Sequence, residues 1–186
     1  MTPDIQITTL GEVSLNLSGQ VKPPSITRKA EALLIYLICN KQAYSREVLA
    51  DLFWENDEPG AALNSLRVAL TQLRPMLKDH LIATHHQIGI RPSASISLDI
   101  QLMQEHLEKS RSLPRNHAQT EALAELAAAV ELYKGPFFAG WYLRNCPRFE
   151  QWQFAQQQLF EQMIFGALQE LVESYLELGN YVPALK

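Results

Sequence analysis

The sequence predicts a two-domain protein, α+β in its first half and all-α in its second. Residues 1–98 combine strand-like alternation with helical periodicity, whereas residues 99–186 show helical periodicity alone. The charge balance changes at the same place, with 9 Lys/Arg and 9 Asp/Glu before it and 7 and 11 after it. A chain of 186 residues that is 47% hydrophobic suits two small globular domains. We therefore predict domains at 1–98 and 99–186.

Two short strands and a buried helix begin the first domain. Apolar and polar residues alternate over residues 5–10 and 13–17, on either side of Gly11, and this pattern predicts two strands joined by a turn. Thr27 can cap a helix that runs to about Asn40, because apolar residues recur there at helical spacing.

Two more helices follow in the first domain. Ser45 is a suitable cap for a short helix that stops after Trp54. Residues 57–59, Asp-Glu-Pro, then start a helix predicted to run to about Asp79, with acids at its positive end and proline in its first turn. The segment 55–58 is either an acidic protein-contact loop or simple helix capping by acids.

The third helix carries two separate stripes. A groove-reading helix needs one face to pack on its own domain and another to reach bases and phosphates. The apolar stripe is Leu63, Leu66, Leu70, Leu73 and Leu77, and the polar, cationic stripe is Asn64, Arg67, Thr71, Arg74 and Lys78. The alternative to a groove-reading helix is an ordinary amphipathic surface helix whose charged face is solvated. Pro75 removes a helix amide, so we expect the helix to bend or end early.

A hairpin at residues 81–84 and 87–90, with a last strand at 96–98, completes the first domain. Strands, three helices and a hairpin form the order of a winged helix. His85 and His86 lie at the wing tip, where side chains can enter a minor groove or can simply make a polar turn. A metal site is disfavoured, since no Cys, Asp or Glu nearby would complete it.

The second half is helical throughout. Asp99 is expected to cap a first helix, and further helices are expected at about 118–134 and 148–178. The final segment 179–186 looks like the start of a second helix of a tetratricopeptide-type pair, so we expect a fragment of a longer protein. The predicted buried face of the long helix is Phe149, Trp152, Leu159, Met163, Ala167, Leu171, Tyr175 and Leu178.

Composition excludes several classes of protein. The net charge is −4 and the pI is near 5.7, so any DNA binding must come from a local cationic face. The sequence has neither an apolar run of bilayer length nor a secretory signal, so we expect a cytoplasmic protein with no membrane association. Cys39 and Cys146 are expected to be reduced thiols. The sequence offers neither a catalytic motif nor a cofactor site, so an enzyme is not predicted.

Several motifs of this chain resemble one family of bacterial regulators. Those of the first half are Thr27-Arg28-Lys29-Ala30-x-Ala32-Leu33-Leu34, Ser45-Arg46-Glu47-x-Leu49-Ala50-x-Leu52-Phe53-Trp54, and Asn64-Ser65-Leu66-Arg67-x-Ala69-Leu70-x-x-Leu73-Arg74. Those of the second half are Leu132-Tyr133-Lys134-Gly135-Pro136-Phe137, Glu150-x-Trp152 and Gly179-Asn180-Tyr181-x-x-Ala184-Leu185. Together they resemble the winged helix and the bacterial transcriptional activator domain of the Streptomyces antibiotic regulatory protein (SARP) family.

The resemblance implies a fold and a set of roles. The fold is an α+β winged-helix domain followed by an all-α, tetratricopeptide-like helical domain. The roles are major-groove reading by the third helix, wing contact with the minor groove, binding to direct repeats as head-to-tail pairs, and recruitment of RNA polymerase. By position, Arg67, Thr71 and Arg74 would be recognition residues, Arg28, Ser45 and Arg46 would contact phosphate, and Glu55, Asp57 and Glu58 would contact the polymerase.

The leading hypothesis is therefore a sequence-specific activator of transcription that binds double-stranded DNA and RNA polymerase, with a homodimer on DNA as a possible assembly. The alternative is a protein-interaction module whose winged helix no longer binds DNA. An enzyme would require catalytic domains beyond Lys186.

Overall fold

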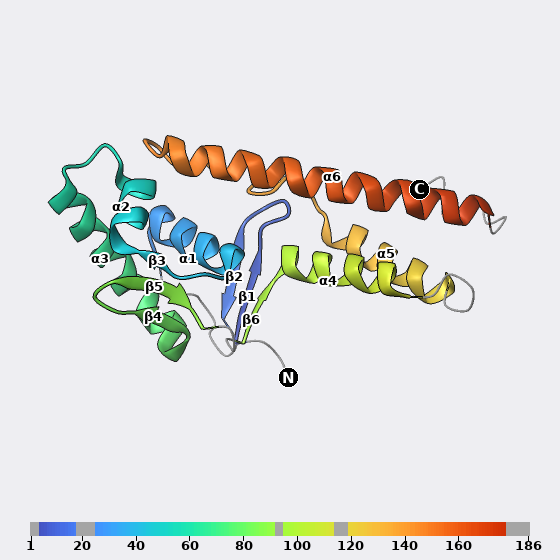
Figure 1. The fold of residues 1–186 in the computed structure, drawn as a ribbon, viewed down its shortest axis with the longest axis horizontal. Coiled ribbons are helices and arrows are strands. Elements are labelled where there is room, and N and C mark those ends of the chain that lie inside the picture. Colours follow the sequence, from blue (N-terminus) through green and yellow to red (C-terminus); the bar gives the residue numbers. More distant parts are fainter. Residues whose placement is uncertain (1–3, 18–24, 92–94, 114–118, 178–186) are drawn as a thin grey trace. The chain divides into compact units, whose positions relative to one another are not determined.

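A computed structural model describes residues 4–17, 25–91, 95–113 and 119–177 (Figure 1). The chain divides into two compact units, each assembled from three stretches of sequence. Unit 1 comprises residues 1–6, 15–96 and 142–153, and unit 2 comprises 7–14, 97–141 and 154–186. An α+β set of elements is followed along the chain by helices alone, as predicted.

The elements follow the predicted winged-helix order (Figure 1). Two three-stranded sheets are present in the described part of the chain, with strand orders β2-β1-β6 and β3-β5-β4. The elements up to residue 98 are β1 (Ile5–Thr8), β2 (Ser14–Leu17), α1 (Arg28–Asn40), β3 (Tyr44–Ser45), α2 (Arg46–Trp54), α3 (Pro59–Leu77), the 3-10 helix η1 (Lys78–His80), β4 (Leu81–Ala83), β5 (Gln87–Ile90) and β6 (Ile96–Leu98).

Helix α1 forms the centre of unit 1. Its residues from Ala32 to Leu37 are all buried, and it packs against α3 and β5. The predicted cap is confirmed, because the Thr27 hydroxyl accepts a hydrogen bond from the Ala30 amide at 3.3 Å. Helix α2 begins in the same way, with the Ser45 hydroxyl accepting from the Val48 amide at 3.2 Å.

The wing is an antiparallel hairpin of β4 and β5, and β3 pairs with the other edge of β5. The two-residue strand β3 was not predicted, because Ser45 was interpreted only as a helix cap. Gly89 in β5 is held close to the turn that leads into β3. A Cβ added there would lie 3.1 Å from the Cα of Ala43, which is tighter than most Cβ contacts, so the neighbouring backbone would have to shift slightly.

Helix α3 continues through Pro75 and ends at Leu77, just before the predicted end at about Asp79, so Pro75 itself does not stop it. The missing proline amide costs one bond, but the Lys78 amide still bonds to the Arg74 carbonyl. Met76 and Leu77 are buried, and this burial stabilises the last turn. At the other end Glu58 is the N-cap residue, yet its side chain makes no capping hydrogen bond.

The helices of the second half are α4 (Asp99–Ser112), α5 (Gln119–Leu132) and α6 (Pro147–Glu177). The expectation that Asp99 caps α4 was wrong, since the N-cap is Leu98 and Asp99 is the first helical residue. Its buried carboxylate instead accepts from the Thr9 amide at 2.6 Å, the Thr9 hydroxyl at 2.7 Å and the Leu10 amide at 2.7 Å. A partner distant in sequence therefore determines the role of this residue.

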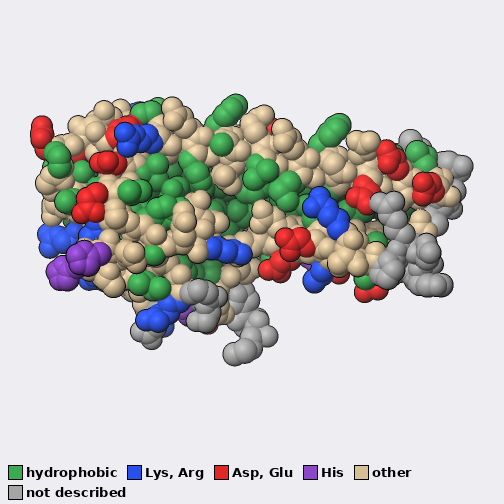
Figure 2. All heavy atoms as spheres, in the orientation of Figure 1, with side chains coloured by type: hydrophobic (Ala, Val, Ile, Leu, Met, Phe, Trp, Pro, Cys, Tyr) green, Lys and Arg blue, Asp and Glu red, His purple; other side chains and the backbone are tan. Residues whose placement is uncertain are grey.

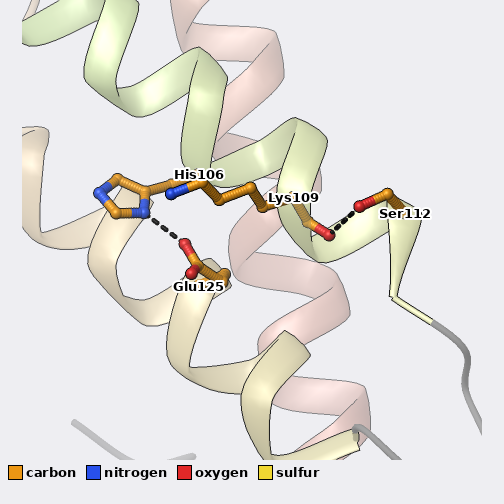
Figure 3. Close-up of polar contacts among 4 residues, drawn as sticks. All are labelled: His106, Lys109, Ser112 and Glu125. Carbon is orange, nitrogen blue, oxygen red and sulfur yellow. Dashed lines mark hydrogen bonds and ion pairs between the residues drawn. The ribbon is translucent and has the colours of Figure 1, made fainter.

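Helices α4 and α5 of unit 2 pack against each other. Figure 3 shows the polar link between them, in which His106 of α4 faces Glu125 of α5, with Nδ1 and Oε2 2.5 Å apart. This hydrogen bond, with a smaller contribution from nearby Lys109, lowers the pKa of Glu125. The Ser112 hydroxyl donates to the Lys109 carbonyl at 2.8 Å and closes the last turn of α4.

The buried face of α6 differs in part from the prediction. Phe149 and Ala167 are buried as expected, but Leu159 is 45% exposed, so its placement on the buried face was wrong. Phe160 and Ile164, each one residue beyond the predicted Leu159 or Met163, are buried, because helical spacing alone does not decide which of two adjacent apolar residues faces the core. Leu178 and the tetratricopeptide-like segment 179–186 lie outside the described residues. Among the described helices, none combines the length and apolarity needed to cross a membrane.

Candidate nucleic-acid interface

The predicted polar stripe is exposed along its whole length. Asn64, Arg67, Thr71 and Arg74 of α3 face solvent, and so does Lys78, which follows the helix as the first residue of η1. Of the predicted apolar stripe, Leu66, Leu70, Leu73 and Leu77 are buried and Leu63 is half-buried. The helix is thus anchored on one side and presents hydrogen-bonding groups on the other, as groove reading requires.

Two hydrogen bonds organise this face. The Arg67 guanidinium donates to the Asn64 side-chain oxygen at 3.0 Å, and the Thr71 hydroxyl donates to the Arg67 carbonyl at 2.9 Å. These contacts restrict the rotamers of the side chains that would meet the bases. Val68, which the sequence analysis missed, is 48% exposed at helical spacing from Asn64 and Thr71. An exposed valine there suits the methyl group of a thymine.

The wing tip is a hydrogen-bonded turn that presents two histidines. The Thr84 hydroxyl accepts from the amides of His86 at 3.3 Å and Gln87 at 3.0 Å, while His85 and His86 are exposed. Arg46, predicted as a phosphate contact, donates through Nε and Nη2 to the Thr84 carbonyl at 3.0 and 2.8 Å. Two of its five N–H groups are therefore used to brace the wing.

Arg28 and Ser45, the other predicted phosphate contacts, lie at the starts of α1 and α2. Arg28 is exposed at the first position of α1, whereas the Ser45 hydroxyl is occupied as a cap. Glu47 follows in the first turn of α2, where a backbone hydrogen bond and the Ser45 side chain lower its pKa. An ionised carboxylate therefore lies beside the α2 end of the interface and opposes close approach of phosphate.

Figure 2 shows histidine and cationic side chains gathered at the end of unit 1 that carries α3 and the wing. Acidic side chains lie at the neighbouring turn between α2 and α3. In that turn, Asp57 and Glu58 are exposed, but only 17% of the Glu55 side chain is. The three predicted polymerase-contact residues therefore have unequal surroundings.

Residues 142–153, here called the return segment, pack beside this turn within unit 1. Phe149 is fully buried, with its ring centroid 5.1 Å from that of Phe53, and the Trp152 ring lies 4.8 Å from that of Tyr36. Trp152 was predicted on the buried face of the long helix, but its aromatic partners are distant in sequence and were not predicted. Trp54, Phe137 and Phe138 are buried as well.

Cys39 and Cys146 form no disulfide in the described part of the chain. Burial raises the pKa of the Cys146 thiol, so it is protonated and donates to the Phe53 carbonyl at 3.1 Å. Within the described residues, no group of three His, Cys, Asp or Glu could hold a metal ion.

Comparison with known proteins gives two family matches in the predicted order. Residues 22–91 match the family described as transcriptional regulatory protein, C terminal, and residues 98–186 match the bacterial transcriptional activator domain. Both are domains of transcriptional regulators. No curated protein matches the chain.

One similar solved structure is Mycobacterium tuberculosis EmbR in complex with a low affinity phosphopeptide. It aligns with a TM-score of 0.72 and 20% identity over 96% of this chain and 47% of that one. The chain thus spans about half the length of that structure, whose likeness supports the fold. With the two regulator domains in succession, the chain has the domain composition of a SARP-family transcriptional regulator.

Proposed function

We propose that this regulator is a sequence-specific DNA-binding activator whose α3 enters the major groove. The observation that carries the proposal is the exposed polar face of α3 opposite a leucine face that is buried except for the half-buried Leu63. Arg67 and Arg74 are assigned to guanine edges or phosphates, Asn64 to adenine, and Lys78 to the backbone. Thr71 already donates to a helix carbonyl, so its methyl group is the part available to thymine.

The wing contributes contacts on the neighbouring minor groove. His85 and His86 are exposed on a turn that Arg46 and Thr84 hold in one conformation. A braced tip loses less conformational entropy on binding than a free loop would. Arg28 is assigned to a phosphate, and Ser45 to another, to which its hydroxyl would donate in place of the Glu47 carboxylate.

We further propose that the protein acts in the cytoplasm on direct repeats, as head-to-tail pairs that form a homodimer on DNA. Its acidic turn, with Glu55, Asp57 and Glu58, is proposed to recruit RNA polymerase. The supporting observation is that Glu58 makes no capping hydrogen bond, so its carboxylate is available to a partner.

A second candidate is a protein-interaction module without DNA binding. The balanced charge of residues 1–98 and the ionised Glu47 in the first turn of α2 favour it. A salt titration separates the two functions. Phosphate neutralisation gives a log–log slope of about −0.9 per contact, whereas an interaction module gives no salt-dependent DNA binding.

The first experiment is selection of bound sequences from a randomised duplex pool. A recurrent motif is expected, and Arg67→Ala or Arg74→Ala should each cost about 1–3 kcal/mol of specific affinity. Arg111→Ala, an exposed arginine of α4, is the control and should leave the affinity unchanged. Absence of enrichment by a folded protein, or equal losses in all three variants, would refute the assignment of α3.

A further inference from the structure

The carbonyl of Phe53 in the last turn of α2 is held by two side chains from outside its helix. The Lys29 ammonium of α1 donates to it at 2.7 Å, and the Cys146 thiol of the return segment donates at 3.1 Å. Carbonyls at a helix C-terminus have no partner within the helix, so these donors fix where α2 ends. The acidic turn starts two residues later, at Glu55.

Arg148 in the first turn of α6 holds the beginning of that turn. Its Nε lies 3.3 Å from Glu55 Oε2, and its Nη1 lies 3.9 Å from Asp51 Oδ2. The other oxygen of Glu55, Oε1, is buried and has no hydrogen-bond partner among the described residues. A carboxylate in that position depends on its ion-pair partner for compensation of its charge.

Aromatic packing fixes the backbone that carries Arg148. The next residue, Phe149, is fully buried against Phe53 and lies 5.3 Å from the Trp152 ring. Arg148 itself is exposed but is attached to a rigid support, which reduces the entropic cost of its ion pair. The Asp57 amide, which donates to the Trp54 carbonyl at 3.0 Å, then sets the course of the turn.

We propose that Arg148 is a positioning residue that holds the acidic turn, so that Asp57 and Glu58, not Glu55, meet a cationic protein surface. This inference rests on the proposed function, in which the acidic turn recruits RNA polymerase. Glu55 faces inward as the anchor of the turn, and the two exposed acids are the contact groups. The return segment, although far away in sequence, thereby determines how the DNA-binding unit presents its activating surface.

Amide hydrogen exchange tests the anchor without any DNA or partner. In Arg148→Ala we expect exchange of the amides at residues 55–58 to accelerate about fivefold, the change that corresponds to about 1 kcal/mol for one partly exposed ion pair. Arg148→Lys, which keeps the charge, should restore part of the protection. Arg144→Ala, an exposed arginine of the same segment with no ion pair among the described residues, should leave the turn unchanged.

Three results of the amide-exchange experiment would refute the claim that Arg148 holds the acidic turn. They are unchanged exchange in Arg148→Ala, equal acceleration in Arg144→Ala, and acceleration spread equally over α1, which would indicate general unfolding.

Transcription in vitro at saturating operator occupancy then tests the consequence for activation. Arg148→Glu brings a third carboxylate to Glu55 and Asp51, so we expect activation to fall at least about fivefold while operator affinity stays within about twofold. Asp57→Asn with Glu58→Gln should lower activation similarly with unchanged exchange at the turn. Full activation by Arg148→Glu would overturn the proposal. If selection from the duplex pool yields no operator, the proposed function fails. The exchange experiment still tests whether Arg148 holds the acidic turn.

Discussion

Replacing Phe149 by alanine should destabilise unit 1, although this residue lies in the helix of the activator-domain match. Its side chain is 0% exposed and stacks near Phe53 and Trp152, at 5.1 and 5.3 Å between ring centroids. Deleting a fully buried phenylalanine costs about 3–5 kcal/mol. A domain has about 5–15 kcal/mol of stability in total, so the loss is a large fraction of it.

The measurement is urea unfolding followed by circular dichroism, together with amide exchange in α1 and α2. Phe154→Ala is the matched control, because this residue lies on the same helix but is 63% exposed. Burial of the remaining third of a phenylalanine is worth less than about 1 kcal/mol, so this variant should remain close to the wild type. Equal losses in the two variants, or unchanged exchange in α1 and α2 of Phe149→Ala, would refute the reasoning.

Three further predictions concern single contacts. Asp99→Ala should lower the free energy of unfolding in urea by about 3–5 kcal/mol, because the Thr9 amide, the Thr9 hydroxyl and the Leu10 amide lose their acceptor. A loss below about 1 kcal/mol would contradict this role. Glu125→Gln should lower the stability at pH 7 and make the stability depend less on pH in acid. The His106 bond lowers the pKa of Glu125 below 4.5, so the stabilisation is present above that pH and is lost as the pH falls through the lowered pKa. Parallel curves of stability against pH for the variant and the wild type would refute this prediction. Gly89→Ala should lower the free energy of unfolding by about 1–3 kcal/mol, because the added Cβ would lie 3.1 Å from the Cα of Ala43. An unchanged midpoint of thermal unfolding would contradict this and show that the wing can shift.

Features determined by local sequence were predicted well. The caps at Thr27 and Ser45 are correct, because each needs only a hydroxyl and an amide three residues later. The leucine stripe of α3 is buried apart from Leu63, which is half-buried, because helical periodicity places its members on one face.

The errors come from partners that are distant in sequence. Asp99 is a residue type that often caps helices, yet its carboxylate accepts hydrogen bonds from residues about ninety positions earlier. Likewise, Arg46 appears from sequence to be free for phosphate, while the wing carbonyl of Thr84 already takes two of its N–H groups. For the candidate site, sequence therefore identified the exposed groups on α3 but not the internal hydrogen bonds that leave some of them less available.

Unit 1 is assembled from stretches that lie far apart in the sequence, and this has a consequence for synthesis on the ribosome. Its described elements through β5 emerge early, but the buried Phe149 and Cys146 emerge only after another fifty or more residues. Chains grow at about 5–20 residues per second, so the nascent winged helix would wait several seconds with Phe53 uncovered. During that interval the exposed aromatic surface is a target for chaperones, and copies truncated before residue 149 would keep it exposed. Completion of unit 1 is thereby coupled to translation of the following domain.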